Sequence, residues 1–348
     1  MLAKVLNFIN SRTASEEAII KYSFYFTILN FSKKDLIMKF EDILSYILFL
    51  PFLLDVLIKY IKGEKEYLKK SFSYFFFLLG VSLTLKLIFK VPRANISYFD
   101  PYAFPSTHAM LATLPVFIFI NNDKKRLIFY LILMISIDLF RVFGGYHTYD
   151  QVIAGNLIGF LSLYLLEHLR NKTKDKGIDR KSIHIGLAVL IGYISYINQF
   201  YGILLLIFLI LLGILLYILK SFIGIIRDFL EWYSKDKSGK EAFTLVIGIF
   251  IPSVIGYLLN IPFYYVAFYM AWLDGLATIF SIYFKPNEIE RGIYHISGGI
   301  IGGIIAYLAT STNPIIIPIL ILIKLALKID DNLILPISAF LINTLISF

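Results

Sequence analysis

Residues Tyr201–Leu219 read YGILLLIFLILLGILLYIL, an apolar run that contains no charged side chain. Such a run matches the ~20 residues that an α-helix needs to cross the hydrocarbon core of a membrane. Similar apolar runs recur along both halves of the chain, separated by short polar loops. The pattern predicts an all-α, polytopic transmembrane protein.

The composition of the chain indicates the same class. Of its 348 residues, 58% are hydrophobic and only 16% are charged. A soluble domain of this size has too little interior to hide so many apolar side chains. The formal net charge is +9, and the basic residues lie in short loops between the apolar runs. This distribution is typical of cytoplasmic loops that face anionic lipid, so we expect no nucleic-acid partner. The absence of cysteine excludes disulfides and thiolate zinc sites.

The apolar runs predict about 11–13 spans in two groups. Those of the first half lie near Ile43–Tyr60, Ser73–Phe89, Thr107–Ile120, Leu127–Phe143 and Val152–Leu166. Those of the second half lie near His184–Asn198, Tyr201–Leu219, Phe243–Leu259, Tyr264–Phe284, Ile293–Thr310, Pro314–Leu327 and Leu333–Phe348. A basic segment separates the groups, so we expect a membrane domain over 1–170, a linker over 171–182 and a C-terminal transmembrane domain over 183–348. An amphipathic charged stretch is also expected over Arg227–Lys240.

The charges of the loops predict an orientation in the membrane. The loops Ile61–Ser71, Asn122–Arg126 and Leu169–Ser182 contain four, three and six Lys or Arg residues, respectively. Alternation of the spans places these loops on one side, which the positive-inside rule identifies as the cytoplasm. The loops Val91–Ser106 and Gly144–Asp150 then share the opposite side.

The N-terminal stretch also bears on this orientation. Its basic residues would lie on the non-cytoplasmic side unless Ala18–Phe31 forms an additional short span, which we therefore expect. The first 17 residues have no signal-peptide pattern, because Asn7 and Asn10 interrupt any apolar core.

Charged and imidazole side chains cluster in the two non-cytoplasmic loops and at the predicted helix ends beside them. They form three groups: K-L-I-F-K-V-P-R (Lys86–Arg93), then P-S-T-H (Pro105–His108), then Arg141 with His147 six residues later. Taken singly, each residue is also consistent with a packed histidine or a snorkelling anchor. Their occurrence together on one face favours a common site.

These residue types fit a site for a phosphoryl group, which needs several fixed cations and hydroxyl or backbone donors. Lys86, Arg93 and Arg141 supply the cations. Pro105 suits the first turn of a helix, which would put Ser106–His108 at a helix N-terminus, where exposed N–H groups favour an anion. Two histidines can divide the chemistry, one attacking phosphorus and the other protonating the leaving oxygen.

The three groups resemble the signature motifs of the type 2 phosphatidic-acid phosphatase superfamily, over about residues 40–170. That superfamily includes lipid-phosphate and polyprenyl-diphosphate phosphatases, glucose-6-phosphatase and vanadium haloperoxidases. The resemblance implies that His147 is a nucleophile forming a phosphohistidine and that His108 is the general acid. It also implies a reaction without a metal or other cofactor, and a set of phosphate ligands comprising Lys86, Arg93, Ser106, Arg141 and the Thr107 backbone N–H.

The chain departs from the family's pattern at four positions. Where the family usually has Pro, Gly and Ser, this chain has Ala94, Thr107 and Phe140. More important, Gln151 stands where the family has an Asp that orients the nucleophilic imidazole, and Asp150 lies one position earlier. Glucose-6-phosphatase resembles this chain in having Gln there. Either Gln151 or Asp150 is therefore expected to support His147.

The second half contains two further candidate residues, Asp274 in A-W-L-D-G-L-A-T and His295 before S-G-G-I-I-G-G. An intramembrane Asp indicates a functional site or a helix–helix hydrogen bond. The small-residue pair Gly298 and Gly302 is typical of close helix packing. The order of these elements is faintly similar to CTP-dependent polyprenol kinases and phosphatidate cytidylyltransferases. A non-catalytic packing or lipid-binding domain is the simpler interpretation.

The sequence thus predicts a metal-independent membrane phosphatase of the acid phosphatase type. We expect it to hydrolyse a phosphomonoester or diphosphate of a lipid or polyprenol through a phosphohistidine, at the non-cytoplasmic face of the cell membrane. Three alternatives stay open: a sugar-phosphate phosphatase, a non-catalytic transporter of a lipid phosphate, and a bifunctional enzyme whose second half is a nucleotide-dependent lipid kinase or cytidylyltransferase. We predict no particular oligomeric state.

Overall fold

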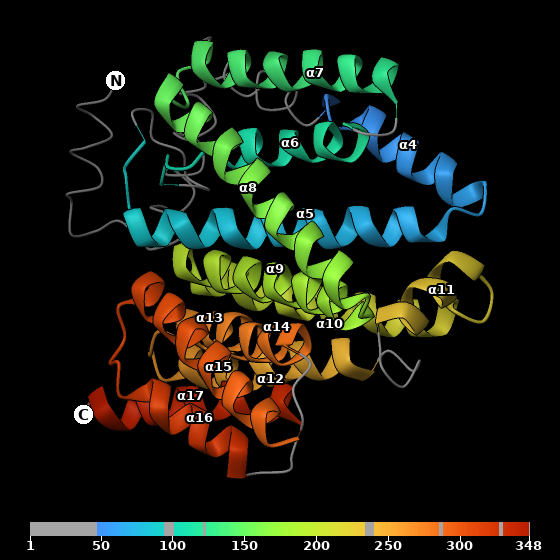
Figure 1. Ribbon diagram of the computed structural model, residues 1–348. Coiled ribbons are helices and arrows are strands. Elements are labelled where there is room, and N and C mark those ends of the chain that lie inside the picture. The colour runs from blue at the N-terminus through green and yellow to red at the C-terminus, as the bar shows by residue number, and fades with distance from the viewer. Residues whose placement is uncertain are drawn as a thin grey trace, which may run out of the picture. The chain divides into compact units, whose positions relative to one another are not determined.

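The computed structural model describes residues 47–93, 101–120, 123–233, 240–284, 288–326 and 330–347. Residues Phe49–Phe348 form one compact unit. The additional span expected at Ala18–Phe31 lies outside the described residues. Every element formed by the described residues is a helix (Figure 1), which confirms the all-α prediction.

The helices of the first half coincide with the predicted apolar runs. They are α4 (Leu50–Ile61), α5 (Lys65–Phe89), α6 (Thr107–Phe119), α7 (Lys124–Phe143) and α8 (Tyr149–Thr173). Helix α6 packs against α5, α7 and α8. The N-terminal ends of α6 and α8 and the C-terminal ends of α5 and α7 are the places where the sequence motifs lie.

The helices of the second half also follow the prediction. They are α9 (Lys176–Ile197), α10 (Gln199–Leu219), α11 (Gly224–Tyr233), α12 (Lys240–Leu258), α13 (Tyr264–Tyr269), η1 (Met270–Asp274), α14 (Gly275–Phe284), α15 (Glu288–Thr310), α16 (Ile316–Ala326) and α17 (Asp331–Ser347). Helix α11 covers part of the amphipathic stretch expected over Arg227–Lys240. Helices α13 and α14 are joined through η1, a single π-helical segment, into one continuous run.

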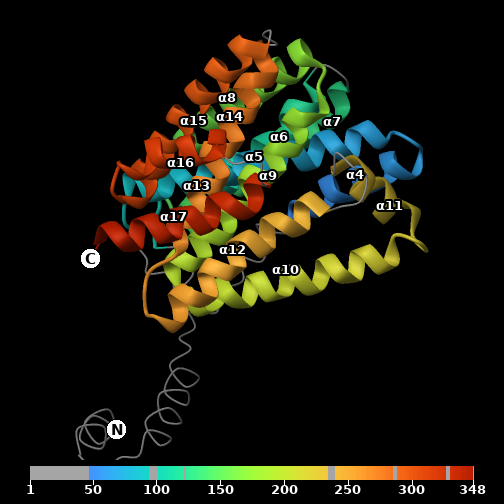
Figure 2. The ribbon, with the colours of Figure 1, turned by 90° about the horizontal axis from the view of Figure 1, so that it is seen from below.

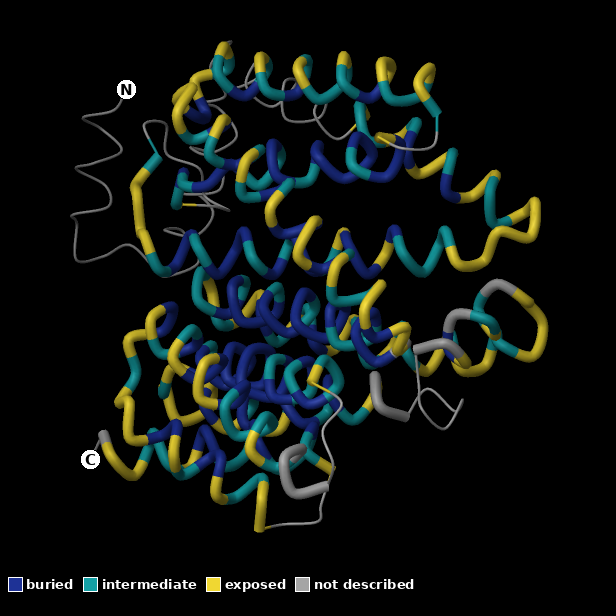
Figure 3. Tube along the Cα trace, in the orientation of Figure 1, coloured by how far each residue is buried: buried dark blue, intermediate teal, exposed yellow. Residues whose placement is uncertain are grey.

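Five of the described helical segments are long and apolar enough to cross a membrane. They are Lys65–Phe89, Tyr149–Thr173, Gln199–Leu219, Tyr264–Phe284 and Gly292–Thr310. Shorter apolar helices include α6 and α16. Large hydrophobic side chains are exposed along α7 and α10, as expected for helices whose outer surface faces lipid rather than water. Figure 3 shows the exposed positions along α7. The chain is therefore an integral membrane protein.

The two halves of the chain pack directly on each other. Figure 1 shows α5 lying between α6 and α9, and the pair α5 and α9 makes the most extensive contact between helices of the described residues. A Cβ added to Gly186 of α9 would lie 2.1 Å from the Phe76 carbonyl oxygen of α5, so this close approach requires glycine. The indole of Trp272 in η1 donates a hydrogen bond of 2.9 Å to the Thr84 hydroxyl of α5.

The run from α13 to α14 is the most enclosed part of the second half. It packs against both α9 and α15, while α10 and α12 lie side by side at one edge (Figure 2). Residues 265–275 are buried throughout. The division into domains over 1–170 and 183–348 stays a prediction, since helices from both sides of it belong to one compact unit.

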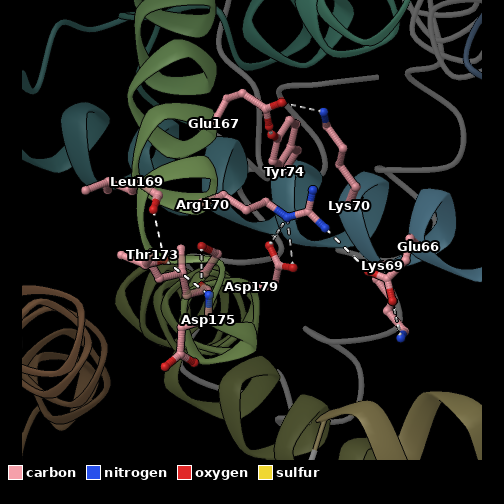
Figure 4. A network of polar contacts seen from close by, with 12 residues as sticks. Glu66, Lys69, Lys70, Tyr74, Glu167, Leu169, Arg170, Thr173, Asp175 and Asp179 are labelled. Atoms are coloured by element: carbon pink, nitrogen blue, oxygen red, sulfur yellow. Dashed lines mark hydrogen bonds and ion pairs between the residues drawn. The ribbon is translucent and has the colours of Figure 1, made fainter. Parts of the chain in front are cut away.

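The basic segment expected as a linker forms two helix ends and a tight turn. Arg170 of α8 donates to both carboxylate oxygens of Asp179 in α9, each at 3.0 Å (Figure 4). Lys70 of α5 pairs with Glu167 of α8 at 2.8 Å. The Arg170–Asp179 pair joins α8 to α9 and the Lys70–Glu167 pair joins α8 to α5, so the end of α8 and the starts of α9 and α5 lie at the same end of the bundle.

Candidate active site

The motif residues come together at the other end of helices α5 to α8. Lys86 lies in the last turn of α5, Ser106 is the N-cap of α6, and Arg141 lies in the last turn of α7. His147 lies in the loop that leads into α8. The three motif cations all act electrostatically on both histidines, so the groups that are separated in sequence share one site.

Lys86 and Arg93 are held by a single backbone carbonyl. The Lys86 ammonium, fully buried, donates to the Tyr102 carbonyl oxygen at 2.6 Å, and Arg93 Nε donates to the same oxygen at 3.2 Å. An antiparallel bridge between Pro92 and Tyr102 fixes this arrangement. The bridge therefore brings the first motif to the loop that precedes the second motif.

The second motif forms the N-terminus of α6. The Ser106 hydroxyl accepts from the backbone N–H of Ala109 at 3.4 Å, which caps the helix. Thr107, in the first turn, shares a hydrogen bond of 2.8 Å with Ser82 of α5. Pro105 lies one residue before the N-cap and not in the first turn, which corrects the expected register by one to two residues. The Ser106 backbone N–H donates to the Gln151 backbone carbonyl oxygen at 3.2 Å, so the starts of α6 and α8 lie together.

A glycine turn connects Arg141 to His147. Gly145 has a φ of 71°, a left-handed conformation that favours glycine. The turn lets the N–H groups of Tyr146 and His147 both approach the Arg141 carbonyl at 3.1 Å. The buried guanidinium of Arg141 lies 4.1 Å from the centre of the Tyr146 ring, a cation–π contact that fixes its position. The third motif is therefore a rigid unit.

Gln151, and not Asp150, is the side chain that contacts His147. Gln151 Oε1 lies 3.2 Å from His147 Nδ1 and also accepts from the Thr148 backbone N–H at 3.2 Å. Because a backbone N–H can only donate, the Gln151 atom in this position is its oxygen, and His147 must carry its proton on Nδ1. Asp150 is exposed in the first turn of α8.

The second ring nitrogen of His147 differs from the first in having no contact with Gln151. His147 Nε2 is buried and has no hydrogen-bond partner among the described residues. With the proton on Nδ1, Nε2 carries a lone pair that faces the site. Burial lowers the pKa of His147 to about 3, and the three motif cations act in the same direction. The imidazole is therefore neutral at physiological pH, the form that a nucleophile requires.

Residues of the second half reach this site and were not anticipated from the sequence. The Tyr102 hydroxyl shares a hydrogen bond of 2.7 Å with the Tyr196 hydroxyl of α9. The Tyr196 ring makes an edge contact with the Tyr264 ring of α13, with centroids 5.0 Å apart. Tyr102 and Tyr196 are 94 residues apart and belong to no motif, so only the fold brings them together.

The two second-half candidates lie elsewhere. Asp274 is buried in η1, and its partner Lys181 precedes Tyr196 by fifteen residues of α9, about 22 Å along the helix axis. His295 is half-buried in α15. Asp274 therefore belongs to a separate cluster, toward the end of the bundle formed by the turn between α8 and α9.

The chemistry of the site suits an anion. Three cations act electrostatically on the neutral imidazole of His147, and the N-terminus of α6 lies beside the start of α8. Within the described ranges, no group of three or more His, Cys, Asp or Glu side chains has the arrangement of a metal site.

Comparison with known proteins gives one match. A family model described as the PAP2 superfamily matches residues 51–175, a segment that runs from α4 into the turn after α8 and contains every motif residue. The comparisons with curated proteins and with solved structures gave no match.

Proposed function

We propose, from the match of residues 51–175 to the model of the PAP2 superfamily, that the protein hydrolyses a phosphorylated lipid or polyprenol through a phosphohistidine. The observation that carries the proposal is the state of His147. Its proton is held on Nδ1 by Gln151, and its Nε2 is buried in a cationic site without a partner in the described part of the chain.

The reaction has two steps. His147 Nε2 attacks phosphorus, a P–N bond forms, and the bond from phosphorus to the leaving oxygen breaks. His108 starts this step as an imidazolium, a form that the bound phosphate anion stabilises, and gives the leaving oxygen its proton. Water then attacks the phosphohistidine while His108 takes a proton from it, the P–N bond breaks, and inorganic phosphate leaves. Lys86, Arg93 and Arg141 stabilise the negative charge on the phosphoryl oxygens in both transition states.

Gln151 has a defined part in both steps. Its carbonyl oxygen keeps the Nδ1 proton in place while Nε2 forms and loses the bond to phosphorus. Because the amide is neutral, it orients the imidazole without the charge stabilisation that a carboxylate would give to an imidazolium. Gln151 is therefore a positioning residue.

The surroundings of the site favour an amphiphilic substrate. Phe89 at the end of α5, Phe143 at the end of α7 and Tyr149 at the start of α8 are exposed aromatic side chains at the same end of the bundle as the motif residues. Aromatic residues at the ends of membrane helices are typical of the boundary between lipid and water. A substrate whose phosphate enters the site while its chain stays in the bilayer fits this position.

A sugar-phosphate phosphatase is the second candidate, favoured by the contact of Gln151 with His147. A panel of phosphatidic acid, a polyprenyl diphosphate and glucose 6-phosphate separates the two candidates by their kcat/KM values. We expect phosphate release from the lipid substrates to persist in EDTA, to be inhibited by orthovanadate and to be absent in His147→Ala. Equal phosphate release by the parent and His147→Ala would contradict the proposal, and binding without release would favour a transporter.

The orientation is proposed from the loop charges. A label attached in the loop before α7, at residues 122–126, should react only after intact cells are opened. Reaction in intact cells would place the catalytic loops on the cytoplasmic side instead.

A further inference from the structure

A second cluster of charged side chains lies inside the other half of the molecule. Asp274 of η1 is 1% exposed, and two lysines donate to it. Lys181 of α9 lies 2.5 Å from Oδ2, and Lys324 of α16 contacts Oδ1. His184, one turn after Lys181 in α9, points its Nε2 at the same carboxylate from 3.9 Å.

Stability does not explain this cluster. Removing several charges from water costs free energy that their mutual attraction barely offsets, and apolar side chains of the same size would pack as well. In a membrane helix, such residues are rare and mark functional sites. The carboxylate also belongs to a π-helical segment, a distortion that is frequent at functional sites because it redirects side chains.

The cluster has more hydrogen-bond donors than it uses. Each lysine ammonium has three N–H donors. Among the described residues, the Lys181 ammonium contacts Asp274 alone, and the Lys324 ammonium contacts Asp274 and, at 3.3 Å, Asp331. His184 is 4% exposed and its Nε2 has no hydrogen-bond partner in the described part of the chain. Buried donors without acceptors are unfavourable, so these groups fit a ligand that has several acceptor oxygens.

The chain of ion pairs from Asp274 through Lys324 ends at a partly exposed residue, Asp331. The Asp331 side chain, which pairs with Lys324, is 36% exposed and so connects the cluster to the surface. Lys181 follows Asp179 by two residues in α9, and Asp179 belongs to the polar network at the turn between α8 and α9 (Figure 4). This end of the bundle is opposite to the one that holds His147, so the two sites do not share an opening.

We propose that Lys181, His184 and Lys324 form a second anion site, which binds the phosphate group of a ligand distinct from the phosphatase substrate. Asp274 holds the two ammonium groups in place, and their remaining N–H donors bind the phosphate oxygens together with the His184 ring. The site is independent of the proposed phosphatase reaction. Its ligand enters from the face opposite to the phosphatase site.

Equilibrium binding to the full chain in nanodiscs tests this proposal. A His147→Ala background prevents turnover, and the probes are radiolabelled orthophosphate, the nucleoside triphosphates ATP and CTP, and phosphatidic acid carried in the disc. Each is measured against Lys86→Met, which removes a phosphatase-site cation, and against a neutral triple variant, Lys181→Met with Asp274→Asn and Lys324→Met. The triple variant makes Lys181, Asp274 and Lys324 all neutral, so none of these three positions is left with an unpaired buried charge. We therefore expect the variant to fold.

We expect at least one probe to bind the Lys86→Met protein as tightly as the background protein and to lose binding in the triple variant. The probe that binds at the lowest concentration identifies the source of the phosphate group as a free ion, a nucleotide or a lipid. Replacing His184 by Phe, which keeps the ring but removes Nε2, should weaken that binding about tenfold at an unchanged unfolding temperature.

The proposal is overturned if none of the probes binds, or if all binding is retained in the triple variant. Either result would make the cluster a structural ion pair. A His184→Phe protein with full affinity would remove the imidazole from the site. Phosphatase activity is measured separately in the parent, so failure of this site and failure of the proposed reaction are told apart.

Discussion

The two charged clusters of this protein are built in opposite ways. At the phosphatase site, Lys86 and Arg93 donate to a neutral backbone carbonyl, that of Tyr102. At the second cluster, Lys181 and Lys324 donate to the carboxylate of Asp274. In the contacts just named, the acceptor at the first site is neutral, whereas the acceptor at the second is a carboxylate that offsets part of the lysine charge. This difference predicts that the first cluster binds an anion more tightly than the second, and that phosphoryl transfer takes place only at the first.

The largest effect tests whether the phosphatase site is a centre of reaction and not only of binding. Replacing His108 by Ala should lower kcat/KM for an alkyl phosphate by about 10⁴-fold, because the leaving alkoxide then departs without a proton. The same substitution should cost far less with p-nitrophenyl phosphate, whose leaving group needs no proton. Equal losses with both substrates would assign His108 a role other than general acid.

The next effect compares one lysine from each cluster. Lys86→Met should lower kcat/KM by about 10³-fold with little change in stability, since the Tyr102 carbonyl keeps its bond from Arg93. Lys324→Met should instead destabilise the protein by about 3–5 kcal/mol, because it leaves buried Asp274 with incomplete charge compensation. Thermal unfolding in detergent and phosphate release measure both. Similar unfolding temperatures for the two variants would remove the distinction between the clusters.

Substitution of Gln151, the partner of the proposed nucleophile His147, should give an intermediate effect. Gln151→Ala should lower kcat by about 10²-fold, since the imidazole loses its orientation and its fixed tautomer. Asp150→Asn is the matched control, because Asp150 is exposed beside it on the first turn of α8, and its kcat should stay within about threefold of the parent. The reverse ranking would show that Asp150 moves onto His147 during turnover.

Introducing a carboxylate at Gln151 would make the first cluster resemble the second. In the parent, burial lowers the pKa of His147 to about 3, so the nucleophile stays neutral down to acidic pH. Gln151→Glu should raise that pKa, because an adjacent carboxylate stabilises the imidazolium, by at least about 1 unit. The acid limb of the pH profile of kcat/KM then moves to higher pH. A profile that does not move, or that moves to lower pH, would contradict this account of the site.

The smallest effect concerns the connection between the halves. Tyr196→Phe removes the hydroxyl that holds Tyr102, whose carbonyl positions two cations. We expect KM and the inhibition constant of vanadate to rise about fivefold with little change in kcat, corresponding to roughly 1 kcal/mol for one hydrogen bond. Tyr201→Phe, an exposed position on α10, is the control and should change neither constant. A parallel fall in kcat alone would indicate a different role.

The sequence predicted the helices, which depend on neighbouring residues, and did not predict the contacts between residues that are far apart in the chain. The helices were predictable because each apolar run is long. The position of Lys86, His108 and His147 at or beside helix ends was predictable for the same reason, whereas their roles stay predictions. Which of Gln151 and Asp150 contacts His147 was not predictable, because it depends on how the first turn of α8 is capped. The contacts Tyr102–Tyr196 and Lys324–Asp274 span 94 and 50 residues and leave no pattern in the sequence.

Trapping the covalent intermediate tests the central claim most directly. A ³²P-labelled substrate is mixed with the parent protein, the reaction is quenched with alkali within milliseconds, and the labelled peptide is identified. The mechanism predicts an acid-labile, alkali-stable label on Nε2 of His147, present in the parent and absent from His147→Ala. Rapid phosphate release by the parent with no such label, or with the label on another residue, would contradict the assignment of His147 as the nucleophile.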